Sequence, residues 1–245
     1  HLDFLGNIAQ LITHSFGRTV RLTEQARLAA IGEFASGIAH EMRTPLATIN
    51  LGLDYLSSRD LGDNARKRLD LAHQEAGRIS RFLEEMLLYA KPLNLKLQHV
   101  DVRQTVERFL HDYQPFVRAL DQRVDLTVAR HGPILADPDR FTQILTNLTQ
   151  NACEAAPAGS VIEWRVDDAR ETGSVLLTIS NPGPSIPAAL LPRITEPFVS
   201  NKPGGTGLGL AIVKRLAEAL GGAIEIRSKQ GLGTRITLTF PRAPD

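Results

Sequence analysis

The chain has 245 residues, of which 42% are hydrophobic and 22% are charged, and its formal net charge is +1. This near-neutral composition is typical of a globular protein and indicates neither a nucleic-acid partner nor an anionic membrane surface. Aromatic residues make up 5% of the chain, which argues against a stacking platform for single-stranded nucleic acid. The length is sufficient for one large domain or two modest ones.

The single cysteine, Cys153, excludes an intrachain disulfide and favours a reducing compartment. Because it lies in an apolar helical run, we expect a buried thiol rather than a reactive one. No apolar run approaches the ~20 residues that span a bilayer, and the start at His1 has no signal-peptide pattern. We therefore expect a cytoplasmic fragment of a longer protein, whose missing N-terminal region would carry any membrane anchor.

The first ninety or so residues have an almost purely helical pattern. Residues 1–23 are expected to be an incoming helix or linker, and residues 24–92 a helical hairpin. The first hairpin helix has apolar residues near heptad spacing, namely Ile31, Ala35, Ile38, Met42, Pro45, Ile49, Gly52 and Leu56. We expect a kink where this spacing falters, at Pro45 and Gly52.

The second hairpin helix follows a turn at residues 61–64, with Asp63 or Asn64 as the expected N-cap. Its heptad seam is unbroken over three repeats: Leu69, Ala72, Ala76, Ile79, Leu83, Met86 and Ala90. One such hairpin has too little core to be stable alone, so we expect two of them to pair as a dimeric four-helix bundle. Pro92 ends the helix and begins a short linker.

From Leu97 onward, short β-rich runs alternate with helical ones, which predicts a separate α/β domain over residues 97–245. The expected helices are 102–119, 138–156 and 208–220, and the expected strands are 124–128, 161–166, 175–179, 223–226 and 234–240. Helices gathered on one face of a mixed sheet form a two-layer sandwich. The predicted fold class is therefore α + α/β, a helical hairpin followed by a two-layer α/β sandwich.

His40 follows the heptad position Ala35 by five residues, so we expect its ring to face away from the hairpin core. A solvated histidine has a pKa near ~6.5 and is accessible to a second macromolecule. Glu41 is placed to accept the imidazole proton, which would leave the other ring nitrogen as a nucleophile. Thr44 lies one turn further along the same face, where its hydroxyl can orient a water.

Two further patterns in the α/β half point to phosphate chemistry. Asn147 and Asn151 lie on one helical face and can hold hydrated Mg²⁺ and phosphate oxygens, although alone they are more simply explained as exposed polar residues. Four glycines within residues 204–209 lead into the helix 208–220, whose N-terminus can face an anion. This loop follows Pro203 and a polar segment rather than a strand, which disfavours a dinucleotide-binding unit.

Five segments, in order, resemble the motifs of the sensor histidine kinase family over residues 24–240. Residues 38–46 resemble its H-box. Residues 147–152, 180–187, 196–202 and 204–210 resemble the N-, G1-, F- and G2-boxes of its GHKL-type ATP-binding domain. The resemblance implies ATP-dependent autophosphorylation of His40, with Glu41 as the general base, followed by phosphotransfer to the aspartate of a response regulator receiver domain. It further implies a homodimer, an upstream sensor domain, and regulator phosphatase activity assisted by Thr44.

The resemblance also implies the nucleotide-site residues. Asn147 and Asn151 would serve Mg²⁺ and phosphate, and Asn181 and Gly183 the adenine. Lys202 would reach a phosphate, with a solvated surface lysine as the alternative. The phosphate loop would comprise Gly205, Thr206, Gly207, Leu208 and Gly209.

Three residues depart from the family pattern. Asn181 stands in place of the usual aspartate, Ser185 in place of a glycine and Thr195 in place of a phenylalanine. The oxygen of Asn181 can still accept a hydrogen bond from adenine, but more weakly because it carries no charge. An alternative is therefore a catalytically weak, dimeric docking scaffold or phosphatase with poor ATP binding. A GHKL ATPase of the chaperone or DNA-repair type would have no use for the H-box hairpin.

Overall fold

The computed structural model describes residues 42, 44–59, 61–129, 131–169, 173–202 and 205–244. The chain divides into two compact units, His1–Pro92 and Leu93–Asp245, which we call the hairpin unit and the α/β unit. His40 and Glu41, the predicted phosphoacceptor and base, lie outside the described residues. No helix among those residues is long and apolar enough to cross a membrane.

The hairpin unit contains helical residues 44–57 and the long helix α2 (Asp63–Ala90). The buried residues of α2 recur every seventh position, which confirms one half of its predicted seam: Leu69, Ala76, Leu83 and Ala90. The first helix contributes Leu46, which is 5% exposed, with Leu53 packed beside it. The N-cap of α2 is Gly62, without a side-chain cap. The prediction of Asp63 or Asn64 there was wrong, since Asp63 is already helical.

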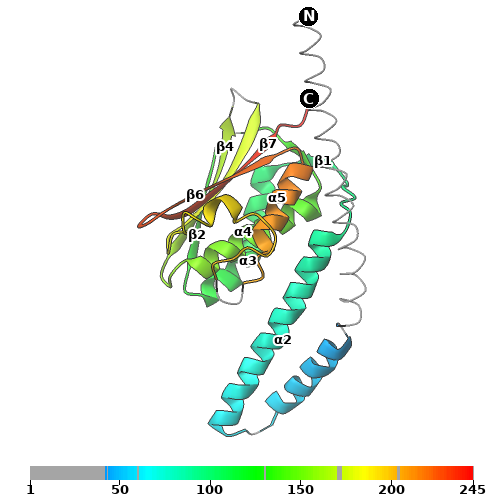
Figure 1. Cartoon of the computed structure of the whole chain (residues 1–245). Helices are drawn as coiled ribbons and strands as arrows, with labels where there is room; N and C mark the ends of the chain where they lie inside the picture. Colours follow the sequence, from blue (N-terminus) through cyan, green and yellow to red (C-terminus); the bar gives the residue numbers. More distant parts are fainter. Residues whose placement is uncertain are drawn as a thin grey trace, which may run out of the picture. The chain divides into compact units, whose positions relative to one another are not determined.

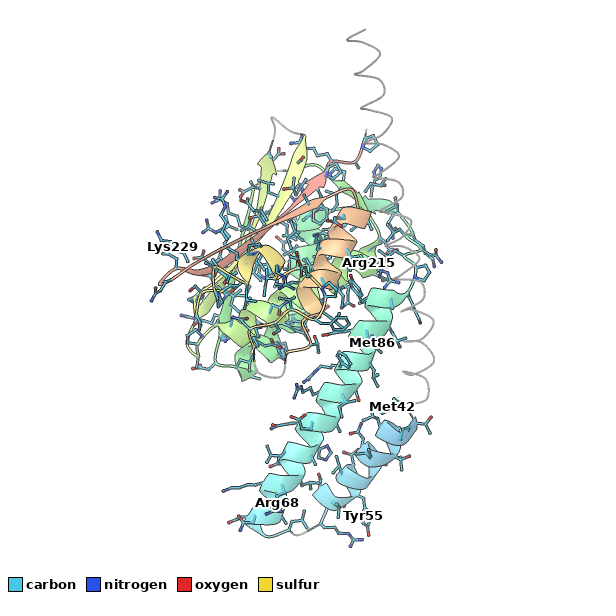
Figure 2. All side chains as sticks on the ribbon, viewed as in Figure 1. Met42, Tyr55, Arg68, Met86, Arg215 and Lys229 are labelled. Carbon is cyan, nitrogen blue, oxygen red and sulfur yellow. The ribbon has the colours of Figure 1, made fainter. Side chains whose placement is uncertain are left out.

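Part of the predicted seam of the hairpin is exposed on the single chain. Met42, Ile49 and Leu56 are 41%, 51% and 45% exposed, and on α2 the seam residue Ile79 is 43% exposed. Figure 2 labels Met42 at the start of this helix. A helix in a four-helix bundle has two apolar flanks, one toward its hairpin partner and one toward a further helix. Leu46 lies on the flank toward α2, where it clusters with Ala76 and Leu83, and the exposed seam residues lie outside that cluster.

The α/β unit begins with β1 (Gln98–Val100), α3 (Val102–Ala119), β2 (Arg123–Val128), β3 (Ile134–Ala136) and α4 (Pro138–Ala155). It continues with β4 (Val161–Ala169), β5 (Ser174–Asn181), η1 (Leu191–Arg193), α5 (Gly209–Ala219), β6 (Ala223–Lys229) and β7 (Gly233–Pro241). The three predicted helices and five predicted strands are confirmed, with bounds shifted by at most three residues. The short strands β1 and β3, which pair with each other, were not predicted.

Within the described residues, the larger sheet has the strand order β2-β4-β5-β7-β6, and its β2–β4 pair is parallel while its other pairs are antiparallel. Alternate residues of β5 are buried, including Val175, Leu177 and Ile179. Figure 1 shows α3, α4 and α5 on the same face of this sheet. An edge-to-face contact of Phe141 with Phe240, with ring centroids 5.6 Å apart, fixes α4 against β7. The predicted two-layer sandwich is confirmed.

The C-terminal end of α4 is held by a side chain from the turn between α3 and β2. Gln122, 4% exposed, donates its Nε2 hydrogens to the carbonyl oxygens of Cys153 at 2.9 Å and Ala156 at 2.8 Å. These are last-turn carbonyls that have no partner within the helix. Burial, followed by the charge of Glu154, raises the pKa of the Cys153 thiol to about 11. The prediction of a buried thiol is confirmed.

The N-terminal end of α4 is held by Asp137. Its Oδ1 accepts the backbone N–H groups of Asp139 at 3.0 Å and Arg140 at 3.2 Å, and its Oδ2 accepts that of Lys96 at 2.8 Å. Burial alone would raise the pKa of this carboxyl, but the three N–H donors outweigh it and lower the pKa below 3.8. Helix α4 is thus anchored at both ends by residues outside it.

Replacing Asp137 by alanine is expected to destabilise the chain by about 2–3 kcal/mol, because it removes a cap and orphans the Lys96 N–H. Since the folded pKa is lowered, the carboxylate stabilises the fold above the unfolded pKa of ~3.9, and this contribution disappears as pH falls through the folded pKa. Asp137→Asn keeps an acceptor without the charge, so its acid sensitivity should be smaller. Urea unfolding at pH 7 and pH 3 measures the free energy of unfolding of both variants. If the Asp137→Asn variant and the wild type lost equal stability between these pH values, the carboxylate would not be the source of the acid sensitivity.

Candidate functional site

Asn147 belongs to α4 and lies in the interior of the α/β unit, 5% exposed, against the start of α5. Its Nδ2 donates to the carbonyl oxygen of Gly209 at 3.3 Å, and its Oδ1 accepts a hydrogen bond from Gln143 at 3.1 Å. The simpler explanation of this residue as a polar group on an exposed helix side is therefore wrong. Asn147 joins the helix of the predicted N-box to the loop of the predicted G2-box.

Asn151 lies one turn further along α4 and approaches the same glycine. A Cβ atom at Gly209 would lie 3.2 Å from Asn151 Nδ2, a distance that a larger residue could occupy only by displacing the carboxamide. Asn151 and Gly209 are nearly sixty residues apart in the sequence, yet the fold brings both asparagines to the N-terminus of α5.

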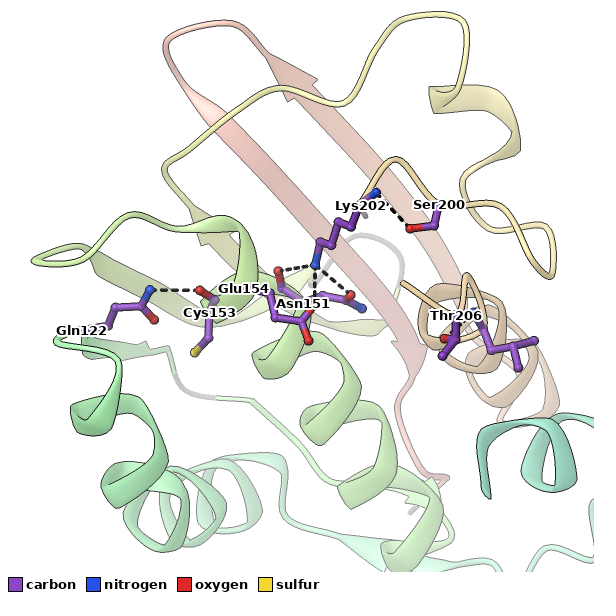
Figure 3. Close-up of polar contacts among 8 residues, drawn as sticks. Gln122, Asn151, Cys153, Glu154, Ser200, Lys202 and Thr206 are labelled. Atoms are coloured by element: carbon purple, nitrogen blue, oxygen red, sulfur yellow. Dashed lines mark hydrogen bonds and ion pairs between the residues drawn. The ribbon is translucent and has the colours of Figure 1, made fainter. Parts of the chain in front are cut away.

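Lys202 extends from the predicted F-box segment onto α4, as Figure 3 shows. Its Nζ lies 2.7 Å from Glu154 Oε2, 3.4 Å from Asn151 Oδ1 and 3.3 Å from the Asn151 carbonyl oxygen. Its side chain is 32% exposed, so it is not the freely solvated lysine of the alternative interpretation. Glu154 was not singled out from the sequence; its only signal there is an acidic side chain three residues after Asn151.

The glycine loop packs closely against the F-box segment before it. Gly207 has φ +70, and a Cβ on it would lie 2.5 Å from the carbonyl carbon of Phe198. Its carbonyl oxygen accepts the Phe198 N–H at 3.0 Å, and the Leu208 N–H donates to Thr206 Oγ1 at 3.2 Å. A side chain at position 207 would therefore be strained and would clash. A Cβ on Gly205 would lie 2.5 Å from Ser200 Oγ, which belongs to a side chain rather than to the backbone.

Helix α5 starts directly after this loop, at Gly209, and its N-cap Leu208 provides no side-chain hydrogen bond. The first N–H groups of a helix have no partner within the helix, and they attract anions. Here they lie beside Asn147 and Asn151. A phosphate chain placed there would meet backbone donors, carboxamides and the Lys202 ammonium together.

The predicted adenine residues lie at the other end of this site, by the last turn of α4. A Cβ on Gly183, which has φ +127, would overlap the carbonyl oxygen of Ala155. Asn181 is 7% exposed and donates its Nδ2 to the Pro182 carbonyl oxygen at 2.8 Å. That bond uses the donor side of the amide and leaves its oxygen as an acceptor. The residues predicted to contact the base and the phosphates thus follow one another along α4.

The residues present fit a magnesium ion that retains most of its waters. Asn151 Oδ1 is a hard oxygen ligand of the kind Mg²⁺ accepts, and it already lies against a cation, the ammonium of Lys202. Within the described parts of the chain, no three His, Cys, Asp or Glu side chains gather as a metal site. Asn147 is less suited to direct coordination, because Gln143 uses its oxygen and Gly209 its nitrogen.

In the hairpin unit, Thr44 lies on the exposed side of the first helix. Its carbonyl oxygen accepts a hydrogen bond from Thr48 Oγ1 at 3.2 Å, as in a regular helix. The side chain is thus accessible to a macromolecular partner. Its position relative to His40 and Glu41 lies outside the described residues.

Two family models match the chain. Residues 30–94 match the His Kinase A (phospho-acceptor) domain, and residues 136–244 match the histidine kinase-, DNA gyrase B- and HSP90-like ATPase. Sensor histidine kinase ZraS of Salmonella typhimurium is 34% identical over 227 residues, covering 90% of this chain and 48% of the relative. Sporulation kinase A of Bacillus subtilis is 30% identical over 229 residues, covering 90% and 36%. The chain therefore spans half or less of the length of these relatives.

Solved structures agree with these matches. Full-length ShkA in complex with AMPPNP has a TM-score of 0.71 and 27% identity, covering 87% of this chain and 46% of its own. Histidine kinase ThkA in complex with the response regulator protein TrrA has a TM-score of 0.66 and 25% identity, covering 89% and 64%. Both family domains are present in order, on the predicted fold. The chain belongs to the histidine kinases and contains the phospho-acceptor and ATPase domains of their catalytic core.

Proposed function

We propose that this chain uses ATP to phosphorylate its own His40 and passes the phosphate to an aspartate of a response regulator. The observation that carries the proposal is the convergence of Asn147, Asn151, Lys202 and the uncapped N-terminus of α5 on one point. That cluster supplies a phosphate site in a chain whose first unit matches a phospho-acceptor domain. The relatives described in complex with AMPPNP and with a response regulator support the same nucleotide and partner classes.

In the proposed nucleotide complex, each residue has a distinct task. Asn151 Oδ1 faces the metal and Asn147 holds the start of α5 in place. Lys202 and the N–H groups of residues 205–209 bind phosphate oxygens, and Asn181 with Gly183 receives the adenine. Mg²⁺, when bound, supplies neutralisation of the phosphate charge.

In the proposed transfer, an imidazole nitrogen of His40 bonds to the γ-phosphorus as the bond to the ADP oxygen breaks. Glu41 takes the ring proton, and most of the rate acceleration comes from positioning. Thr44, exposed on its helix, orients the water that dephosphorylates the regulator.

The proposed assembly is a homodimer built on residues 24–92, with the ATP-binding domain over residues 97–245. The exposed apolar residues Met42, Ile49, Leu56 and Ile79 support it, because a second hairpin would cover them. Use of cellular ATP places this core in the cytoplasm, and residues 1–23 would connect it to an upstream sensor domain.

A second candidate is a dimeric docking scaffold or regulator phosphatase that binds ATP poorly. Asn181 favours it, because a neutral amide accepts a hydrogen bond more weakly than a carboxylate. The amide orientation favours the kinase instead, since the oxygen of Asn181 remains available to adenine. Calorimetry with an ATP analogue and Mg²⁺ distinguishes the two, and absence of binding heat would favour the scaffold.

Incubation with γ-labelled ATP and Mg²⁺ is expected to label the chain through a phosphoramidate bond. The label should be lost in acid and retained in alkali, and it should move to a receiver domain added afterwards. Acid-stable label would indicate a hydroxyl acceptor and would contradict the proposal. A receiver domain whose phosphoacceptor aspartate is replaced by asparagine serves as the matched control.

A further inference from the structure

The ammonium group of Lys202 has three acceptors on α4, and the nearest is a carboxylate that no motif assigns. It lies 2.7 Å from Glu154 Oε2, and at 3.3–3.4 Å from the two oxygens of Asn151. Figure 3 shows Lys202 reaching down to these groups from the segment that also carries Ser200. The Lys202 N–H donates to Ser200 Oγ at 3.1 Å. One side chain therefore ties this segment to α4.

The position of this ammonium conflicts with the roles proposed for its neighbours. A metal ion at Asn151 Oδ1 would compete with Lys202 for that oxygen, because both are cations. A phosphate oxygen would likewise compete with Glu154 for the hydrogens of the Lys202 ammonium. The Lys202–Glu154 pair and the proposed nucleotide contacts therefore oppose one another.

We propose that Glu154 is a positioning residue that holds Lys202 on α4 in the absence of nucleotide and yields it to phosphate when nucleotide binds. This inference rests on the proposed function. Glu154 then competes with phosphate for the Lys202 ammonium, and this competition lowers nucleotide affinity. The Glu154 side chain is 57% exposed, so water can solvate the carboxylate once Lys202 leaves.

An exposed ion pair of this kind shifts an equilibrium by about two- to fivefold. Glu154→Gln is therefore expected to bind AMPPNP with Mg²⁺ about two- to fivefold more tightly than the wild type. Adenosine, which has no phosphate, should bind both equally. Glu218→Gln, which removes an exposed carboxylate from α5, should match the wild type with both ligands.

A double-mutant cycle with Lys202→Met separates this role from simple repulsion between Glu154 and phosphate. The gain from Glu154→Gln should vanish when Lys202 is already methionine. A gain that persists in the Lys202→Met background would overturn the proposal, because a carboxylate that only repels phosphate needs no lysine. A loss of affinity in Glu154→Gln would equally overturn it, since Glu154 would then be preparing Lys202 for phosphate.

Hydrogen exchange of the nucleotide-free chain gives a readout independent of binding. Glu154→Gln and Lys202→Met should each speed amide exchange of residues 198–202 by about two- to fivefold, and the double variant no further. Unchanged exchange in both single variants would show that Glu154 does not hold this segment, and would overturn the proposal. Failure of the wild type to bind AMPPNP would count against the proposed function. The hydrogen-exchange rates of the variants would still decide whether Glu154 holds Lys202 on α4.

Discussion

The His40→Gln variant is expected to take up no phosphate from γ-labelled ATP. Glutamine is close to histidine in size and polarity, but its amide nitrogen is not a nucleophile. Removing a nucleophile costs on the order of 10³-fold or more, so the label should fall to the assay background. AMPPNP binding should be unchanged, because the proposed nucleotide residues all belong to the other unit.

His73→Gln provides the matched control for this variant. His73 is also in the hairpin unit, where its Nε2 lies 3.2 Å from Ser57 Oγ and 3.8 Å from Asp54 Oδ1. It therefore reports any effect of losing a hairpin histidine as such, and it should retain labelling. Equal labelling of His40→Gln and the wild type would assign the acceptor to another residue, even if the chain remained a kinase.

The long elements of the fold could be predicted because their patterns extend over many residues. The heptad spacing of α2 and the periodicity of α3 located both helices to within a residue or two. The strands β1 and β3 have three residues each, too few for an alternation to stand out. The N-cap of α2 was misplaced because Asp63 is favourable both as a cap and in a first helical turn.

In the first hairpin helix, the heptad spacing does not show which apolar residue packs on α2. Its apolar residues fall on two flanks, and periodicity gives their spacing but not which flank faces which neighbour. The structure assigns Leu46 to the contact with α2 and leaves Met42 and Ile49 exposed. The spacing alone therefore did not single out Leu46 as the residue that packs on α2.

The site was predictable where motifs mark it and not where tertiary contacts make it. The carboxamide pair and the glycine loop stand out in the sequence. Lys202 and Glu154 are 48 positions apart in the sequence, and Gln122 and Cys153 are 31 positions apart. Such contacts depend on how a loop packs on a helix, and neither partner has a local signal.

Asn151→Asp is expected to reduce autophosphorylation by about 10²- to 10³-fold, the effect of altering one well-placed electrostatic group. The substitution preserves shape and replaces Nδ2 by a charged oxygen. The new charge would lie beside the phosphate chain and would also strengthen the hold on Lys202, 3.4 Å from Asn151 Oδ1. Both effects oppose nucleotide binding, so AMPPNP affinity should fall together with labelling.

Asn147→Ala should also abolish labelling, but it is a less selective test. Asn147 is buried and donates to Gly209, so its removal leaves the Gly209 carbonyl without that partner. This costs about 1–3 kcal/mol of stability in addition to any loss of function. Asn151 is only partly buried, and its aspartate variant should unfold near the wild-type temperature. Of the two, Asn151→Asp therefore separates chemistry from folding.

Gln150→Glu controls for the added charge in Asn151→Asp. It introduces a carboxylate on the neighbouring residue of α4, where Gln150 interacts with Tyr113 of α3 rather than with Lys202. Labelling should persist in Gln150→Glu and be lost in Asn151→Asp, while both variants remain dimers by light scattering. Equal loss in both would indicate that any negative charge on α4 suffices, and dimer loss in Asn151→Asp would make Asn151 structural. Selective loss in a folded dimer is the result expected of a residue within the metal and phosphate site.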